Sequence, residues 1–134
     1  MPAADTPFAY AILRVVPHVE RGEQFNVGVV LFCRQLDYLD LRTRVDAQRL
    51  MALAPDLDLA EVRASLEAIG AVVCGDPTGG ALARLPASER FGWLVAPAST
   101  VIQPSKVHTG LTQNPGATLE RLFGTLVHAP GMST

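Results

Sequence analysis

Two apolar runs near the start of the chain constrain its fold more than any other feature. Residues 8–16 (FAYAILRVV) and 25–33 (FNVGVVLFC) each have two faces, defined by alternate residues, that are mostly apolar. That pattern is typical of strands covered on both sides. A third segment, 38–44 (YLDLRTR), alternates between apolar and polar residues. Three strands joined by short connections predict an antiparallel meander.

The second run contains two residues that are unusual inside a strand. Regular alternation places Asn26 and Gly28 on one face. Glycine in a strand interior marks a bulge or a close approach by other backbone or a ligand, and a buried asparagine needs hydrogen-bond partners. Arg14 on the neighbouring strand also needs a partner. We therefore expect Arg14, Asn26 and a carboxylate from the charged connection 17–24 to form a polar cluster at one end of the sheet. The opposite face of the second run is expected to carry Phe25, Val27, Val29, Leu31 and Cys33.

Segments whose apolar residues recur at helical spacing follow the three predicted strands along the chain. Asp46, Asp58, Ser88 and Asn114 are predicted N-caps, and Gly70 is the expected end of the helix that begins at Asp58. The glycine- and proline-rich segment 74–86 is expected to be a loop. Strands followed by helices predict an α+β fold, in which an antiparallel β-meander of three or more strands is covered by three to four helices. The two main apolar helix stripes are Leu59, Val62, Leu66, Ile69 and Val73, and Leu119, Leu122, Phe123, Leu126 and Val127.

Length and composition bound the class of protein. The 134 residues fit a single domain over 1–134, with an ordered core at about 8–127 and short loose tails. A formal net charge of −2 argues against nucleic-acid binding through bulk charge. No apolar run could span a bilayer and no signal peptide is recognised, so we expect a cytoplasmic protein without a membrane partner. Cys33 and Cys74, each in apolar surroundings, are expected to be buried reduced thiols.

Polar residues that could carry function fall in two segments. The first is the connection 17–24, with Arg21 and Glu23, and the second is 96–110 (APASTVIQPSKVHTG). The second segment lacks the serine spacings of known nucleophile motifs, so a polar edge strand is favoured over a catalytic serine. The histidines and cysteines show no metal-binding spacing, and we predict neither a metal nor a cofactor.

Three stretches together resemble one bacterial family, the domain of unknown function DUF3037. They are YAILRVVPHVERGEQFNVGVVLF, ERFGWLVAPASTVIQPSKVHTG and LERLFGTLV, in the same order over about residues 8–127. The resemblance implies no established activity. It does imply a protein partner, because such proteins are associated with genomic neighbours that resemble HipA-like kinases. The matching positions are Arg14, Pro17, Arg21, Gly22, Glu23, Asn26, Gly28, Glu89, Arg90, Phe91, Pro97, Ser99, Thr100, Gln103 and His108.

Two functions are consistent with these patterns. The favoured one is a binding or accessory subunit that acts with a protein partner. The alternative is a small enzyme or ligand-binding domain for a phosphate-bearing or nucleic-acid substrate, held by arginines, with Glu23 or His108 moving protons. Arginines that converge in a concave pocket would favour the alternative, and a flat face beside exposed apolar residues would favour a binding subunit. The candidate binding residues are Arg14, Arg21, Glu23, Asn26, Arg90, Ser99, Thr100, Gln103 and His108.

Overall fold

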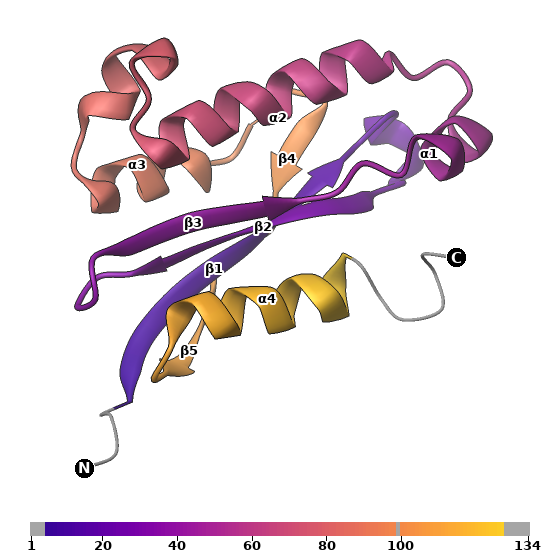
Figure 1. Ribbon diagram of the computed structural model, residues 1–134. Helices are drawn as coiled ribbons and strands as arrows, with labels where there is room; N and C mark the ends of the chain where they lie inside the picture. Colours follow the sequence, from indigo (N-terminus) through magenta and orange to yellow (C-terminus); the bar gives the residue numbers. More distant parts are fainter. Residues whose placement is uncertain (1–4, 99, 128–134) are drawn as a thin grey trace.

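The computed structural model describes residues 5–98 and 100–127. Within them a five-stranded antiparallel sheet carries helices on both faces (Figure 1). The strand order is β3-β2-β1, and both β4 and β5 pair with the free side of β1. The predicted α+β fold and β-meander are confirmed. The strands are β1 (Thr6–Val15), β2 (Phe25–Cys33), β3 (Tyr38–Thr43), β4 (Ile102–Pro104) and β5 (His108–Thr112).

The helices lie in two layers around the sheet. In Figure 1, α2 and α3 cover one face, α1 lies at the end of the sheet, and α4 crosses the opposite face. Of the tails expected from the sequence at 1–7 and 128–134, residues 1–4 and 128–134 lie outside the described residues, whereas Thr6 and Pro7 belong to β1. The helices are α1 (Ala47–Leu53), α2 (Leu59–Cys74), α3 (Ala87–Leu94) and α4 (Pro115–Leu126), with short 3-10 segments η1 (Val19–Arg21) and η2 (Pro77–Arg84).

Three of the four predicted helix caps are confirmed. The side chains of Asp46, Asp58 and Asn114 each accept a hydrogen bond from the backbone N–H three residues later, at 3.1 Å. The cap predicted at Ser88 is wrong, because α3 follows Pro86 with no side-chain cap bond.

Two predicted boundaries around α2 are also wrong. The helix continues through Gly70 and ends at Gly75, whose φ of 71° is the left-handed conformation that closes many helices. A glycine inside a helix is tolerated when the apolar stripe continues beyond it. The expected loop at 74–86 contains the 3-10 turns of η2, which are interrupted at Gly80.

The sheet separates two apolar clusters. The larger lies between the sheet and α2, where the predicted stripe is confirmed: Val62, Leu66 and Val73 are buried, with Leu59 and Ile69 packed beside them. The smaller lies beneath α4 and consists of Phe8, Val29, Leu31, Cys33, Leu119 and Leu122. Cys33 is buried as expected, whereas Cys74 is exposed, because it is the last residue of α2 and follows the inward-facing Val73.

A bulge in β2 overturns the face assignment made from regular alternation. On β1, Leu13 pairs with Gly28 while the next residue, Arg14, pairs with Asn26, so Val27 is an extra residue in β2. Val27 therefore packs in the α2-side cluster, whereas Val29 packs beneath α4. The expectation that Asn26 and Gly28 share a face is wrong for the same reason.

Candidate functional site

The register of the sheet places three candidate residues in one row. Arg14 on β1 lies opposite Asn26 on β2 and opposite Gln103 on β4. Directly paired residues of antiparallel strands project to the same face. Asn26 identifies that face, because its Nδ2 donates to the carbonyl of Leu126 at the end of α4, at 3.0 Å. The predicted Arg14–Asn26 proximity is therefore observed.

His108 extends this row along β1. It pairs with Tyr10, four residues before Arg14, and the two rings stack with centroids 5.1 Å apart. Tyr10 packs in the cluster beneath α4, so these side chains lie on the same face as Asn26. We call the set Tyr10, Arg14, Asn26, Gln103 and His108 the open-face row.

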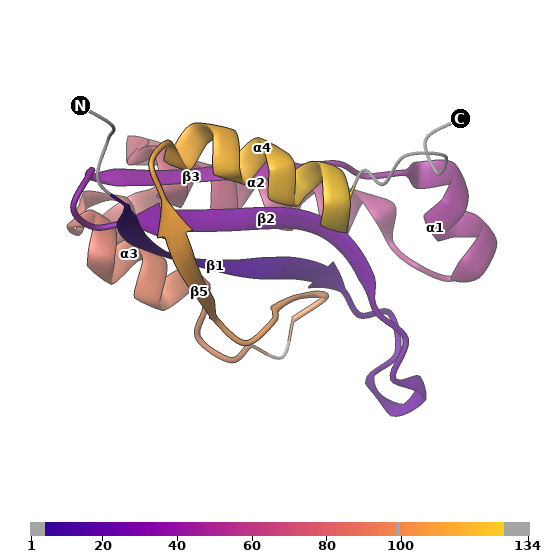
Figure 2. The same cartoon turned by 90° about the horizontal axis from the view of Figure 1, so that it is seen from below.

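Only part of the open-face row contacts α4, through Tyr10 in the cluster beneath it and Asn26 at its end. That helix packs along β2 and β3, and near its start it reaches β5, where Thr118 hydrogen-bonds to Thr112 at 2.6 Å. Figure 2 looks onto this side of the sheet and shows β1 and β5 exposed beside the helix. Among the described residues, the part of this sheet face formed by β4, β5 and the adjoining side of β1 has no helix packed along it.

The charged tip of the first connection does not join the row. Arg21 and Glu23 pair with each other at 3.5 Å, and the Arg21 side chain is 63% exposed. Figure 2 shows this connection projecting away from the sheet. Arg14 donates instead to the side-chain oxygen of Gln24, at 2.7 Å. The carboxylate expected beside Arg14 is therefore replaced by an amide, because Glu23 pairs with Arg21 and Glu20 lies beside His18.

Arg90 has a structural position. Its guanidinium donates to the carbonyls of Val72 and Val73 in the last turn of α2 and to that of Leu85, at 2.7–3.0 Å. The carbonyls at a helix C-terminus lack partners within the helix and attract cations. Arg90 thus fastens α3 to the end of α2, on the opposite side of the sheet from the open-face row.

In the second polar segment, residues 96–110, most side-chain hydrogen bonds are to backbone carbonyls of the same segment. Thr100 donates to the carbonyl of Ile102 at 2.7 Å, and Gln103 donates to that of Thr100 at 3.2 Å. Ser99 lies outside the described residues. Ser105 is buried and bridges the gap between β4 and β5, because its Oγ accepts from the N–H of Ile12 and donates to the carbonyl of Lys106. Such a hydroxyl shapes the strand rather than serving as a nucleophile.

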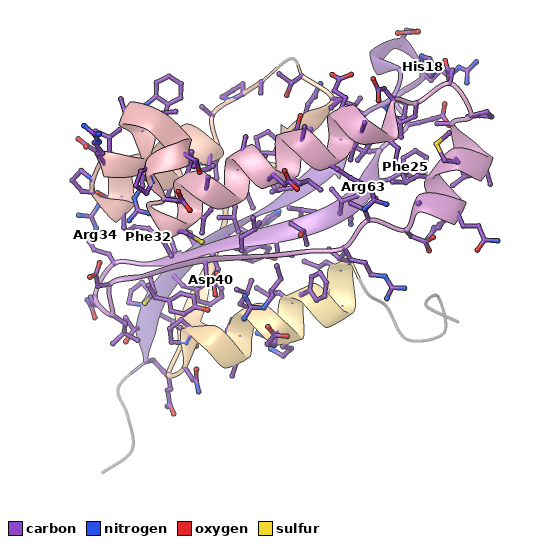
Figure 3. All side chains as sticks on the ribbon, turned by 45° about the horizontal axis from the view of Figure 1, so that its top comes forward. His18, Phe25, Phe32, Arg34, Asp40 and Arg63 are labelled. Carbon is purple, nitrogen blue, oxygen red and sulfur yellow. The ribbon has the colours of Figure 1, made fainter. Side chains whose placement is uncertain are left out.

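A cleft of about 440 Å³ lies at the far end of β1. Its central contact was not predicted from the sequence: His18 Nε2 lies 3.1 Å from Asp56, and His18 Nδ1 lies 3.8 Å from Glu20. Figure 3 shows His18 where the β1–β2 connection approaches the start of α2. The lining residues are Val16, Pro17, His18, Asp56, Leu57, Asp58, Glu61, Thr100 and Val101.

The charge of this cleft disfavours anions. Asp56, Asp58 and Glu61 contribute three carboxylates, and the hydrogen bond from His18 lowers the pKa of Asp56. Asp58 is already engaged as the cap of α2. A signal for the cleft was present in the sequence as closely spaced carboxylates at 56–61, but their approach to His18 depends on tertiary packing.

The described part of the chain shows neither a metal-binding cluster nor a membrane-spanning helix. No group of three or more His, Cys, Asp or Glu side chains there is arranged to hold a metal ion. No helix within the same ranges has the length and apolar character needed to cross a membrane.

The fold and the row together define a small α+β protein whose antiparallel sheet is only partly covered by a helix on one face. The chain belongs to the DUF3037 family, described as a protein of unknown function, whose model matches residues 10–127. No curated protein and no solved structure matches the chain.

Proposed function

We propose that this protein is a binding or accessory subunit that docks onto a protein partner through the open-face row. The observation that carries the proposal is the convergence of four sequence candidates, Arg14, Asn26, Gln103 and His108, on one sheet face that α4 covers only in part. These residues come from four different strands and from distant parts of the sequence. A sheet holds them rigidly, which reduces the entropic cost of binding.

The chemistry of the row suits a protein surface. Tyrosine and arginine are enriched at interface positions that contribute most to affinity, and a stacked Tyr10–His108 pair offers a flat aromatic platform. The Arg14 guanidinium has five N–H donors, and Gln24 engages one of its terminal nitrogens. The remaining donors favour a partner that presents a carboxylate or a backbone carbonyl.

The enzyme alternative has less support. Arg14, Arg21 and Arg90 lie in separate environments, bound to Gln24, Glu23 and backbone carbonyls respectively. The described cleft at His18 is lined by carboxylates, which repel a phosphate. A HipA-like kinase as the partner remains a prediction from the family resemblance.

The test is partner capture followed by a binding measurement with purified components. Tagged wild-type protein is used to isolate partners from the native host, and each captured protein is then purified and titrated. Arg14→Ala and His108→Ala should each weaken its binding by about tenfold, equivalent to about 1.4 kcal/mol. Arg63→Ala is the matched control, because this exposed arginine lies on α2, across the sheet from α4 (Figure 3).

Two results would contradict the proposal. One is a purified partner that binds wild type and both open-face variants equally. The other is a partner whose binding is lost with Arg63→Ala and retained with Arg14→Ala. Melting temperatures measured on the same samples separate a lost contact from a lost fold.

A further inference from the structure

The backbone of β5 presents a free hydrogen-bonding edge. Among the described residues, β5 pairs only with β1. On β1, the N–H of Ile12 donates to Ser105 Oγ, the carbonyl of Ile12 accepts from the N–H of Ser105, and the N–H of Val16 donates to Val101. Even-numbered residues of β1 therefore direct their backbone groups toward β4 and β5.

The direction of these β1 backbone groups identifies which backbone N–H and C=O groups of β5 face outward. Tyr10 lies opposite His108, so His108 directs its backbone toward β1. Backbone groups of successive residues in a strand point to opposite sides. Thr109 and Leu111 consequently direct their N–H and C=O groups away from β1, at the outer edge of the sheet.

The same edge is apolar and unprotected. Leu111 is 64% exposed and Val107, just before β5, is 41% exposed. Natural edge strands are commonly protected by prolines, lysines or bulges. Pro104 and Lys106 occur around the preceding strand and its connection, but β5 itself, HTGLT, contains neither proline nor lysine.

We propose that the β5 edge binds the β5 edge of a second copy of this chain. An antiparallel pairing centred on Thr109 places Thr109 opposite itself and Val107 opposite Leu111 of the other copy. Val107 of each copy then contacts Leu111 of the other, so the same apolar contact forms on both sides of the twofold axis. A self-complementary interface requires this symmetry. No charged side chain of β5 faces a like charge in this register. The contact uses the backbone edge at Thr109 and Leu111, whereas the open-face row consists of side chains on one face of the sheet.

The expected dimer is weak. Stable interfaces bury about 1,200–2,000 Å², and one short strand pair with two apolar contacts buries less. We therefore expect a reversible monomer–dimer equilibrium, visible by sedimentation velocity between about 10 μM and 1 mM.

Edge variants test the dimer. Leu111→Lys should shift the equilibrium to monomer by about tenfold or more, because it replaces an apolar contact with an edge charge. Thr109→Pro should do the same, since it removes an outward N–H and leaves the bonds to β1 intact. Leu53→Lys, at an exposed leucine on α1, is the control and should leave the equilibrium unchanged.

Disulfide trapping tests the register. In a Cys74→Ser background, Thr109→Cys should form an intermolecular disulfide, because the two Cα atoms would lie about 5.5 Å apart. Val107→Cys alone should not cross-link, since its symmetry mate lies four residues along the strand. Val107→Cys combined with Leu111→Cys should cross-link again.

A chain that stays monomeric up to about 1 mM would overturn the proposal. A dimer that persists in Leu111→Lys and Thr109→Pro would also overturn it, because the interface would then lie elsewhere. Cross-linking of Val107→Cys that equals that of Thr109→Cys would reject the register.

Discussion

Tyr10 on β1 and His108 on β5 stack across their strand pair, with ring centroids 5.1 Å apart and ring planes inclined by 25°. Phe8 continues the stack from Tyr10 at 6.1 Å. The stack joins the second polar segment of the sequence to the central strand. His108 therefore helps to hold β5 in place as well as contributing to the open-face row.

This contact gives a stability prediction. His108→Ala should lower the free energy of unfolding by about 0.5–1.5 kcal/mol, the usual contribution of an aromatic pair. His108→Phe should keep most of that energy, because it preserves a ring against Tyr10. Chemical denaturation of the three proteins provides the measurement, and equal losses in both variants would show that the stack contributes nothing.

Arg90 separates a structural role from a binding role. Arg90→Ala removes the charged donor from the carbonyls of Val72, Val73 and Leu85. A hydrogen bond to a charged group contributes about 1.5–3 kcal/mol. Because Arg90 makes three such bonds, the free energy of unfolding should fall by at least about 1.5 kcal/mol. Binding of a captured partner, measured well below the melting temperature, should be unchanged. Weakened binding by a fully folded variant would place Arg90 in an interface instead.

The general arrangement of the fold was predictable because it depends on local patterns. Apolar alternation identified β1 and β2, and a single side chain at each of Asp46, Asp58 and Asn114 identified a helix start. Such signals need no knowledge of tertiary contacts. Ser88 failed as a cap because Pro86 begins the turn two residues earlier.

The candidate site was predictable only in part, because register is a tertiary property. The extra residue at Val27 reverses the faces within β2, and nothing in the spacing of β2 indicates which residue is the extra one. A shift of one residue exchanges every side chain between the two faces. Gly28 was the available signal, since glycine in a strand interior marks a bulge or a close approach. The meeting of His18 with Asp56 likewise requires the β1–β2 connection to pack beside α2.

Gly28 lies where β3 approaches closely. A Cβ atom at this position would lie 3.0 Å from Thr43 Cγ2 and 3.1 Å from the carbonyl oxygen of Arg42. Gly28→Val should therefore lower the free energy of unfolding by about 1–3 kcal/mol through overpacking. Gly70→Ala is the matched control in α2, where a Cβ meets nothing within 4 Å, and it should raise stability by about 0.5–1 kcal/mol. Thermal and chemical denaturation should show opposite signs for the two variants, and a neutral Gly28→Val would mean that β3 can move away without cost.

Asp76 gives a prediction about acid stability. Its carboxylate accepts hydrogen bonds from the backbone N–H and the hydroxyl of Thr78, both at 2.9 Å, and these bonds lower its pKa below the ordinary value of 3.8. A carboxyl group whose pKa is lower in the folded state contributes stability above its unfolded pKa and loses it as the pH falls through the folded value. Wild type should thus lose this contribution below about pH 4.

Asp76→Asn isolates the titration from the cap, because asparagine retains an acceptor oxygen but does not ionise. The free energy of unfolding of the variant should depend less steeply on pH between about pH 5 and pH 2. Thr78→Val provides a second variant, which removes the hydroxyl donor and keeps the backbone donor, so its acid dependence should lie between the other two. Urea denaturation at a series of pH values measures how steeply the free energy of unfolding of each of the three proteins depends on pH. Identical slopes would mean that the cap at the start of η2 forms equally well with a protonated Asp76.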